Sequence, residues 1–340
     1  MRTLIIAEAG VNHNGNIEIA KKLVETAAEA GADYVKFQTF KAEKIVSFKA
    51  KKADYQSLNL NDDQISQYEM LKKLELSHSD HIELKGFAEK CGIKFTSSPF
   101  DVESIEYLQK IGVDLFKCPS GEITNYPYLK ALAQTGAKLI LSTGMANYGE
   151  IEAAIQLLME NGLKKDKLTV LHCNTQYPTP LKDVNLLAMN AIKTAFGVNV
   201  GYSDHTLGIE VPTAAVALGA SVIEKHFTLD RTMDGPDHVA SLEPNELTSM
   251  VHAIRNIELA TSGSGIKEVT PSELENKKIA RKSIHIIRPL KKGDEIRESN
   301  LISLRPGDGI SPMEWERIVG KRVTTDLEAN HMLEWRDISN

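Results

Sequence analysis

The sequence predicts an α/β fold, a TIM (β/α)8 barrel, followed by a small carboxy-terminal β-rich domain. The first observation behind this prediction is a repeated pattern in which a glycine ends a helical segment and a strand starts within three residues. Glycine suits the left-handed position after a helix, and such short connections are typical of alternating βα units. The pattern occurs at Gly31-Ala-Asp-Tyr, Gly92-Ile-Lys-Phe, Gly112-Val-Asp-Leu, Gly136-Ala-Lys-Leu and Gly219-Ala-Ser-Val.

The second observation is the number of strands. Apolar runs alternate with amphipathic helical segments, among them 17–30, 151–161 and 247–260. Eight βα units over about 260 residues are the size of a TIM barrel. A doubly wound open sheet would need a Gly-x-Gly-x-x-Gly loop after the first strand, and Glu8-Ala-Gly-Val-Asn-His-Asn-Gly lacks that spacing. The eight predicted strands are residues 4–8, 34–38, 94–98, 115–117, 138–142, 168–173, 198–201 and 221–227.

Three further segments interrupt or follow the barrel. Residues 41–77 are much longer than an ordinary βα connection, so we expect an excursion over the barrel mouth. Thr261-Ser-Gly-Ser-Gly-Ile is a flexible break that leads into a polar linker. We therefore predict a barrel at 1–265, a linker at 266–282 and a small domain at 283–340, with strands at 283–288 and 301–304 and a helical piece at 312–319. So small a domain is marginally stable alone, and we expect it to dock elsewhere.

The bulk composition excludes several classes of protein. The chain has 340 residues, 42% of them hydrophobic, and a net charge of −6. This charge argues against a nucleic-acid or anionic-membrane partner over the whole surface. No apolar run approaches the ~18 residues of a membrane helix, and the first residues do not form a signal peptide. Three cysteines without a CxxC pair indicate reduced thiols, so we expect a cytoplasmic protein.

The third observation is that polar residues end nearly every predicted strand. In a barrel, polar residues at the carboxyl ends of strands are typical of a catalytic site. In strand order these residues are Glu8, Asn12 and His13; Lys36 and Gln38; Ser97 and Ser98; Lys117, Ser120 and Glu122; Ser142 and Thr143; His172, Asn174, Thr175 and Tyr177; Ser203 and His205; and Glu224 and His226.

Side-chain alternation along the strands separates residues that face the barrel centre from those that pack against helices. Lys36 and Gln38 share one face of their strand. Lys225 lies on the face opposite to His226, so Lys36 and Lys117 are the expected central cations.

His205 and His226 end two neighbouring strands and could together hold a divalent metal. Such a pair, completed by carboxylate or water ligands, leaves open positions for a substrate. The spacing is not that of an HExxH motif, and histidines on different strands more often make ordinary hydrogen bonds. From the residues alone both interpretations stay open. We interpret Asp204 as a turn cap and Asp230 as a solvated charge.

The cations and hydroxyls at the strand ends predict a pocket for a phosphate or carboxylate group. Each serine by itself is equally well explained as the cap of the following helix. The turn Pro119-Ser-Gly-Glu carries Glu122, which is our candidate for a general base. The groups that would form the pocket are Lys36, Lys117, Ser98, Ser120, Ser142 and Ser203.

Several of these stretches occur together in one known family. They are Ala7-Glu-Ala-Gly-Val-Asn-His-Asn-Gly, Val35-Lys-Phe-Gln, Lys117-Cys-Pro-Ser-Gly-Glu, Leu141-Ser-Thr-Gly-Met, Tyr177-Pro-Thr-Pro, Gly201-Tyr-Ser-Asp-His-Thr, Glu224-Lys-His-Phe-Thr and Gly235-Pro-Asp. With them the sequence resembles the sialic acid synthase family over essentially its whole length. Leu304-Arg-Pro-Gly-Asp-Gly-Ile is similar to the antifreeze-like (SAF) domain of that family.

The resemblance implies a metal-dependent condensation. Members of the family join phosphoenolpyruvate (PEP) to an open-chain N-acylated hexosamine, add water and release phosphate by C–O cleavage. By resemblance, His205 and His226 would bind Mn²⁺, with Mg²⁺ or Co²⁺ as alternatives, and the metal would polarise the sugar aldehyde. The resemblance also implies a domain-swapped homodimer in which Arg305 reaches the acyl group of the sugar in the partner subunit.

Residue roles also follow from the resemblance. Thr175 has Asn174 beside it as an alternative for the same contact, and Ser98 stands where threonine occurs in some members. The implied catalytic residues are Glu8, Glu122, His205 and His226, with Glu122 activating the water. The implied PEP-binding residues are Lys36, Ser98, Lys117, Ser120, Ser142, Thr175 and Ser203. The implied sugar-binding residues are Gln38, Tyr177, Asp237 and Arg305.

The identity of the sugar stays open at this stage. We lean to N-acetylmannosamine, which gives N-acetylneuraminate; the alternative is 2,4-diacetamido-2,4,6-trideoxymannose, which gives legionaminate. The region of Thr175 and Ile279, where the sequence departs from some members, contains contacts that would discriminate the two. Two remote alternatives are a metal-free Schiff-base aldolase that uses Lys36 or Lys117, and an ice-binding module, against which the charged segment 291–297 argues.

Overall fold

The computed structural model describes residues 2–47 and 66–339. The chain divides into two units, Met1–Ser262 and Gly263–Asn340.

Eight parallel strands form a nearly closed barrel in the described part of the first unit, so the TIM-barrel prediction is confirmed. Their order is β3-β2-β1-β8-β7-β6-β5-β4, and the two end strands are joined by Thr96 Oγ1, which donates to the carbonyl oxygen of Leu115 at 2.6 Å. The strands are β1 (Leu4–Gly10), β2 (Tyr34–Thr39), β3 (Lys94–Pro99), β4 (Leu115–Cys118), β5 (Lys138–Ser142), β6 (Leu168–Cys173), β7 (Asn199–Asp204) and β8 (Val222–His226).

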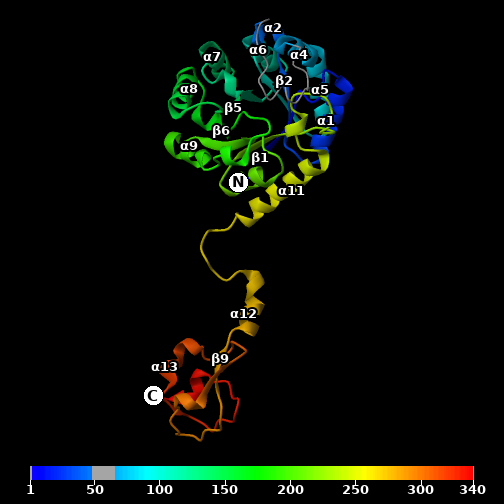
Figure 1. Cartoon of the computed structure of the whole chain (residues 1–340). Helices are drawn as coiled ribbons and strands as arrows, with labels where there is room; N and C mark the ends of the chain where they lie inside the picture. Colours follow the sequence, from blue (N-terminus) through cyan, green and yellow to red (C-terminus); the bar gives the residue numbers. More distant parts are fainter. Residues whose placement is uncertain (1, 48–65, 340) are drawn as a thin grey trace. The chain divides into compact units, whose positions relative to one another are not determined.

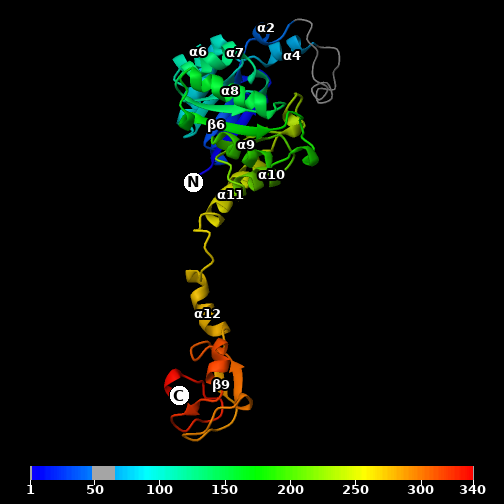
Figure 2. The same cartoon turned by 90° about the vertical axis from the view of Figure 1, so that its left-hand side faces the viewer.

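Helices surround these strands, as Figures 1 and 2 show. The side chain of Asn16 caps the first helix, and Asn147 closes a capping box on α8. The five glycines of the repeated pattern all have positive φ, as the pattern predicts. The helices of this unit are α1 (Ile17–Glu29), α2 (Ala42–Ile45), α4 (Gln67–Leu74), α5 (His78–Lys90), α6 (Val102–Lys110), α7 (Tyr126–Gln134), α8 (Tyr148–Glu160), α9 (Ala188–Phe196), α10 (Glu210–Ala217) and α11 (Pro244–Ala260).

The barrel interior is apolar at the amino ends of the strands and polar at their carboxyl ends. The apolar residues that fill it are Ile6, Tyr34, Leu115, Ile140, Leu171 and Val222. Because side chains alternate along a strand, the next inward-facing residue follows two positions later. Those next residues are Glu8, Lys36, Lys117, Ser142, Cys173 and Glu224. An apolar floor therefore lies directly beneath the polar mouth.

Part of the predicted excursion at 41–77 lies outside the described residues. The described part includes α2 and α4, and α4 buries Met70 and Leu74 against Val11 and Phe40. The excursion thus adds a small apolar cluster beside the mouth.

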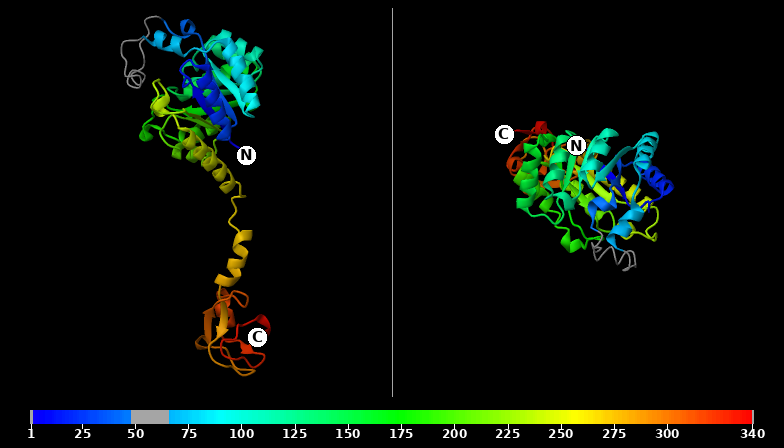
Figure 3. Two further views of the ribbon diagram at one scale, coloured as in Figure 1. Left: turned by 90° about the vertical axis from the view of Figure 1, so that its right-hand side faces the viewer. Right: turned by 90° about the horizontal axis from the view of Figure 1, so that it is seen from above.

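The second unit, coloured gold to red in Figure 3, has its own core. Its elements are α12 (Leu274–Ala280), β9 (Ser283–Ile286), β10 (Leu301–Leu304), α13 (Trp315–Ile318), β11 (Arg322–Val323) and β12 (Ile338–Ser339). Strands β9 and β10 pair antiparallel, as do β11 and β12. The core residues are Ile284, Ile286, Leu290, Ile296, Leu301, Ile310, Ile318, Val323, Leu327 and Leu333. In the part of the chain that the structure describes, no helix has the length and apolar character that a membrane span requires.

The packing of β7 against β8 predicts opposite effects for two glycine substitutions. A Cβ at Gly201 would come within 2.2 Å of the carbonyl oxygen of Val222, which is backbone and cannot move aside cheaply. We expect Gly201→Ala to lower the free energy of unfolding by about 2 kcal/mol or more. Gly86 lies in α5 with open space around it, so Gly86→Ala should raise that free energy by about 0.5–1 kcal/mol. Urea denaturation measures both, and equal effects of the two substitutions would contradict this packing.

Candidate active site

A cavity of about 630 Å³ opens at the carboxyl ends of the strands. It brings together residues from all parts of the barrel, as expected for this fold. Of the residues to which the resemblance gave a role, those lining it are Glu8, Lys36, Gln38, Ser98, Lys117, Ser120, Ser142, Thr175, Tyr177, Ser203, His205, His226 and Asp237.

Two of the residues to which the resemblance gave a role do not line this cavity. Glu122 follows the lining residues Ser120 and Gly121, but its carboxylate accepts a hydrogen bond from Asn125 Nδ2 at 2.5 Å. Arg305 belongs to the second unit, where it is exposed and its Nε donates to the carbonyl oxygen of Ala280. The roles expected for these two residues stay predictions.

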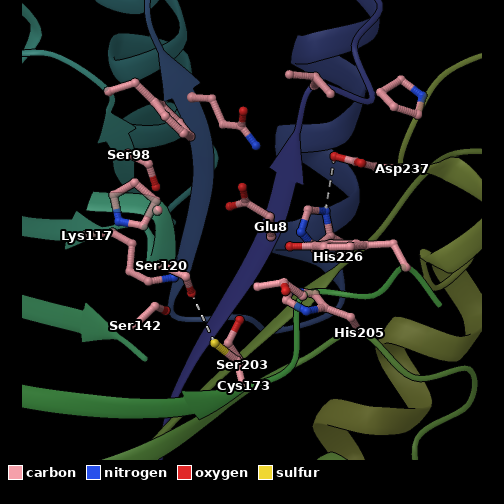
Figure 4. Close-up of a pocket in the computed structure, with 18 of the residues that line it drawn as sticks. Glu8, Ser98, Lys117, Ser120, Ser142, Cys173, Ser203, His205, His226 and Asp237 are labelled. Carbon is pink, nitrogen blue, oxygen red and sulfur yellow. Dashed lines mark hydrogen bonds and ion pairs between the residues drawn. The ribbon is translucent and has the colours of Figure 1, made fainter. Parts of the chain in front are cut away.

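The cavity has two chemically different sides (Figure 4). Most of the labelled lysine and serine groups gather on one side, and His205, His226 and Asp237 lie on the other, with Glu8 and Ser203 between them. The labelled groups on the first side are Ser98, Lys117, Ser120 and Ser142. This division suits two partners that meet in the middle, one anionic and one bound near the imidazoles.

Glu224 is the centre of the charge network on the cavity floor. One of its oxygens, Oε1, accepts from Lys117 Nζ at 2.5 Å and from Ser203 Oγ at 3.0 Å. The other, Oε2, lies 3.4 Å from Lys36 Nζ. Burial alone would raise the Glu224 pKa, but the Lys117 and Lys36 ammonium groups outweigh it and hold this pKa below its usual value. Sequence reasoning noted Glu224 at a strand end but gave it no role.

Glu8 is the second carboxyl group in this network. Its Oε2 lies 3.0 Å from Lys36 Nζ, which also donates to Ser98 Oγ at 2.9 Å. Burial raises the Glu8 pKa to about 7, against the pull of Lys36. A carboxyl group with a pKa near neutrality is suited to accept and return a proton.

The backbone of Gly144 packs closely against the lining residue Ser120. The Gly144 N–H donates to Ser120 Oγ at 3.0 Å, and Ser120 Oγ lies 3.3 Å from Cys173 Sγ. A Cβ on Gly144 would come within 2.7 Å of that hydroxyl oxygen and 2.5 Å of Thr175 Cγ2. Position 144 therefore needs glycine. Cys173, which the sequence analysis treated only as a thiol, is one of the lining residues.

His205 is fixed by a hydrogen bond from one of its two ring nitrogens to the backbone. Its Nδ1 donates to the carbonyl oxygen of Asn174 at 2.5 Å, which leaves Nε2 as the atom with a free lone pair. The ring of Tyr177 stacks on it with centroids 4.0 Å apart. Asn174 therefore acts through its backbone, while Thr175 lines the cavity.

His226 completes an imidazole pair with ring centroids 5.4 Å apart. Its Nδ1 is buried without a hydrogen-bond partner and lies 3.9 Å from Asp237 Oδ2. Gly10 has φ +54° and leaves room for this ring, since a Cβ there would lie 3.3 Å from His226 Cε1. Burial lowers the pKa of His205 to about 4 and that of His226 well below its usual value, so both rings are neutral near pH 7.

This donor set fits a metal that keeps open positions. Two neutral imidazoles converge, and one buried nitrogen lacks a partner. Among the described residues no group of three His, Cys, Asp or Glu side chains is arranged to hold an ion. Further ligands would have to come from water or a substrate, as in catalytic rather than structural sites.

Apolar side chains line one part of the cavity, which the sequence analysis did not foresee. They come from the ends of β2 and β3 and from the excursion. For Met70, Leu71 and Leu74 the signal in the sequence is the spacing of apolar residues within 67–74, which is typical of a helix with one apolar face. The residues are Phe40, Met70, Leu71, Leu74 and Phe100.

Known proteins match this chain along its length. The model of the NeuB family matches residues 23–267, and the model of the SAF domain matches residues 281–339. The chain is 54% identical to the N,N'-diacetyllegionaminic acid synthase of Campylobacter jejuni, covering 98% of this chain and 99% of that protein. It is 49% identical to the protein of the same name from Legionella pneumophila, covering 99% and 95%.

A solved structure resembles this one. The N-acetylneuraminic acid (sialic acid) synthetase of Leptospira borgpetersenii, in complex with citrate, aligns with a TM-score of 0.71 and 36% identity. The alignment covers 81% of this chain and 90% of that one.

The raised pKa of Glu8 predicts a stability that depends on pH. Because the Glu8 pKa is about 7 in the folded protein and the ordinary value for glutamate is 4.5, the folded state holds this proton more tightly than the unfolded state does. The resulting stabilisation is fully present below about pH 4.5 and is lost as the pH rises through 7. Glu8→Gln should therefore be more favourable to stability, relative to wild type, at pH 8 than at pH 5, by on the order of 1–3 kcal/mol.

Urea denaturation at the two pH values measures this difference. Glu18→Gln is the matched control, since Glu18 has 70% of its side chain exposed and should show no such change. A Glu8→Gln effect of equal size at both pH values would contradict the raised pKa.

Proposed function

This chain belongs to the NeuB family, and we propose that it condenses PEP with an open-chain N-acylated sugar to give a nonulosonic acid and phosphate. The observation that carries the proposal is the two-sided cavity, in which buried Lys117 lies on the side opposite the pair His205 and His226 (Figure 4), and which buried Lys36 also lines. One side suits a small anion with phosphate and carboxylate groups, and the other suits an aldehyde.

PEP would bind on the lysine side. Lys36 and Lys117 are held in place by Glu224, so little reorganisation is needed when the anion arrives. Hydroxyl donors surround the same space. The groups that we propose to contact PEP are Lys36, Ser98, Lys117, Ser120, Ser142, Thr175 and Ser203.

The sugar would bind on the histidine side, with Gln38, Tyr177 and Asp237 as contacts. We propose that His205 and His226 hold a divalent metal, Mn²⁺ first, in this part of the cavity. Such an ion supplies Lewis-acid polarisation of a carbonyl oxygen.

The reaction forms one bond between C3 of PEP and the aldehyde carbon, and breaks the bond from C2 to the phosphate oxygen. Water supplies the oxygen that becomes the new keto group at C2. Of the protons of that water, one reaches the new hydroxyl and one leaves with phosphate. Glu8 lines the cavity and has a pKa near 7, so we propose that it relays a proton there. Glu122 is the proposed base for the water, which requires its carboxylate to leave Asn125.

We propose 2,4-diacetamido-2,4,6-trideoxymannose as the sugar, with N,N'-diacetyllegionaminate as the product. Relatives that carry this product in their names are 54% and 49% identical, whereas the neuraminic acid synthetase structure is 36% identical. The apolar lining from Phe40, Leu71 and Phe100 also suits a sugar with a methyl group in place of a hydroxyl. The sequence by itself favours N-acetylmannosamine, so this assignment differs from that expectation.

We further propose that two copies of the chain assemble and that Arg305 of one reaches the sugar in the other. Exposure of Arg305 within its own unit is consistent with a partner elsewhere.

The direct test of the proposed function is phosphate release from PEP in the presence of Mn²⁺ and either sugar. We expect the diacetamido-trideoxy sugar to give a kcat/KM at least tenfold above that of N-acetylmannosamine, because a misplaced hydroxyl against an apolar wall costs about 1–3 kcal/mol. EDTA should abolish the release and added Mn²⁺ should restore it. Faster turnover of N-acetylmannosamine would overturn the sugar assignment, and turnover that survives EDTA would overturn the metal.

Two substitutions should separate the subsites kinetically. Lys117→Met removes a charged donor, so the KM for PEP should rise roughly 10–100-fold with little change in the KM for the sugar. Gln38→Leu, a replacement of similar size, should raise the KM for the sugar with little change in the KM for PEP. Steady-state kinetics with each substrate varied in turn measures the split. If both variants raise both KM values alike, the proposed division of the cavity is wrong.

A further inference from the structure

Behind the histidine pair lies a buried ion pair that does not line the cavity. Lys225 Nζ lies 2.5 Å from Asp204 Oδ2, and both side chains have 0% of their surface exposed. The two residues are register partners on β7 and β8. Nothing in the proposed chemistry uses them.

Each member of this ion pair directly precedes one histidine in the chain. Asp204 is followed by His205, and Lys225 is followed by His226. Because consecutive side chains of a strand point to opposite faces, a pair that joins the strands on the outside sets where the next two residues lie on the inside.

The turn around His205 is bound to the same ion pair from both sides. The Asp204 carboxylate accepts from Thr206 N at 3.1 Å and from Thr206 Oγ1 at 3.0 Å. Lys225 Nζ also donates to the carbonyl oxygen of Thr206. The residues before and after His205 are thereby tied to β8, the strand that ends in His226.

This ion pair is a poor source of stability. Both side chains are fully buried, so each charged group has given up its contact with water. Replacing a buried ion pair by neutral groups of similar size is often neutral or stabilising, whereas removing one partner leaves an unpaired charge at a large cost. A role other than stability is needed to explain its presence.

We propose that Asp204 and Lys225 are positioning residues that hold His205 and His226 at the separation a divalent metal needs. The inference rests on the proposed metal pair. It predicts that a neutral replacement of both residues folds but binds the metal more weakly.

The test compares Mn²⁺ binding to metal-free full-length proteins. Calorimetric titration gives the dissociation constant, and the electron paramagnetic resonance signal of free Mn²⁺ gives an independent value without any substrate. For the double variant Asp204→Asn/Lys225→Met we expect the dissociation constant to rise roughly tenfold or more, as for other groups that orient metal-binding histidines. Its Tm should stay within a few degrees of wild type, because no charge is left unpaired.

A matched control lies at the opposite end of the barrel. Asp33 and Arg255 form an ion pair at 2.8 Å far along the chain from either histidine. Asp33→Asn/Arg255→Met likewise replaces one carboxylate and one cation by neutral groups, while Arg2 and Glu258, which also pair with these residues, keep their charges. It should leave the Mn²⁺ dissociation constant within twofold of wild type. An equal loss of affinity in both double variants would overturn the inference, as would an unchanged affinity in Asp204→Asn/Lys225→Met.

His226→Ala separates failure of this inference from failure of the proposed function. If wild type and His226→Ala bind Mn²⁺ alike, the metal pair itself is wrong and the inference falls with it. Should the Asp204→Asn/Lys225→Met variant not fold, Thr206→Val keeps both charges and removes only the hydroxyl bond to Asp204. A severalfold rise of the dissociation constant in Thr206→Val supports the positioning role, and an unchanged value contradicts it.

Discussion

The site depends on the two-residue period of the barrel strands. On six strands, an apolar residue of the barrel floor is followed two positions later by a residue of the cavity, for example Ile6 by Glu8 and Val222 by Glu224. The floor keeps water from entering between the strands from below. Charges just above it therefore interact through a medium of low effective dielectric constant, where a well-oriented pair is worth more than in water. Stability and chemistry thus come from successive residues of the same face.

The charged groups on this floor compensate one another before any ligand binds. Glu224 lies between Lys36 and Lys117 and is held ionised by them, while Glu8 keeps a pKa near 7. Burial by itself would lower the pKa of Lys36, but Glu224 and Glu8 raise it, so this buried ammonium group keeps its charge. The same carboxylates disfavour anion binding, because the proposed substrate PEP meets negative charge as well as positive charge when it enters the cavity. A divalent ion at His205 and His226 would offset that repulsion, which ties the proposed metal to anion binding as well as to the aldehyde.

Local sequence patterns predicted the barrel because each strand carries its own signal. The bounds of β5 and β6 were predicted to the residue, and thirteen of the fifteen site residues line one cavity. The sequence could not predict the role of Glu224, since its partner Lys117 is 107 positions away and only closure of the barrel brings them together. The orientation of Glu122 depends on a rotamer that no pattern encodes. The apolar wall also escaped prediction, because it joins an excursion to two strand ends. The family resemblance is confirmed by the matches to the NeuB and SAF models.

The outer face of β7 and β8 follows from the same period. On β7, Ser203 points inward, so the next residue, Asp204, points outward. On β8, Glu224 and His226 point inward, so Lys225 between them points outward. On that outer face the neighbours are helices rather than ligands. Apolar side chains would satisfy that packing at lower electrostatic cost. Apolar contacts are non-directional, so they would not fix the position of β7 along β8. An ion pair with hydrogen bonds to the turn at Thr206 has one geometry and therefore fixes that position. Because His205 and His226 come from two different strands, the distance between them depends on the position of one strand along the other. The ion pair outside the barrel and the imidazole pair inside it are therefore two consequences of a single register.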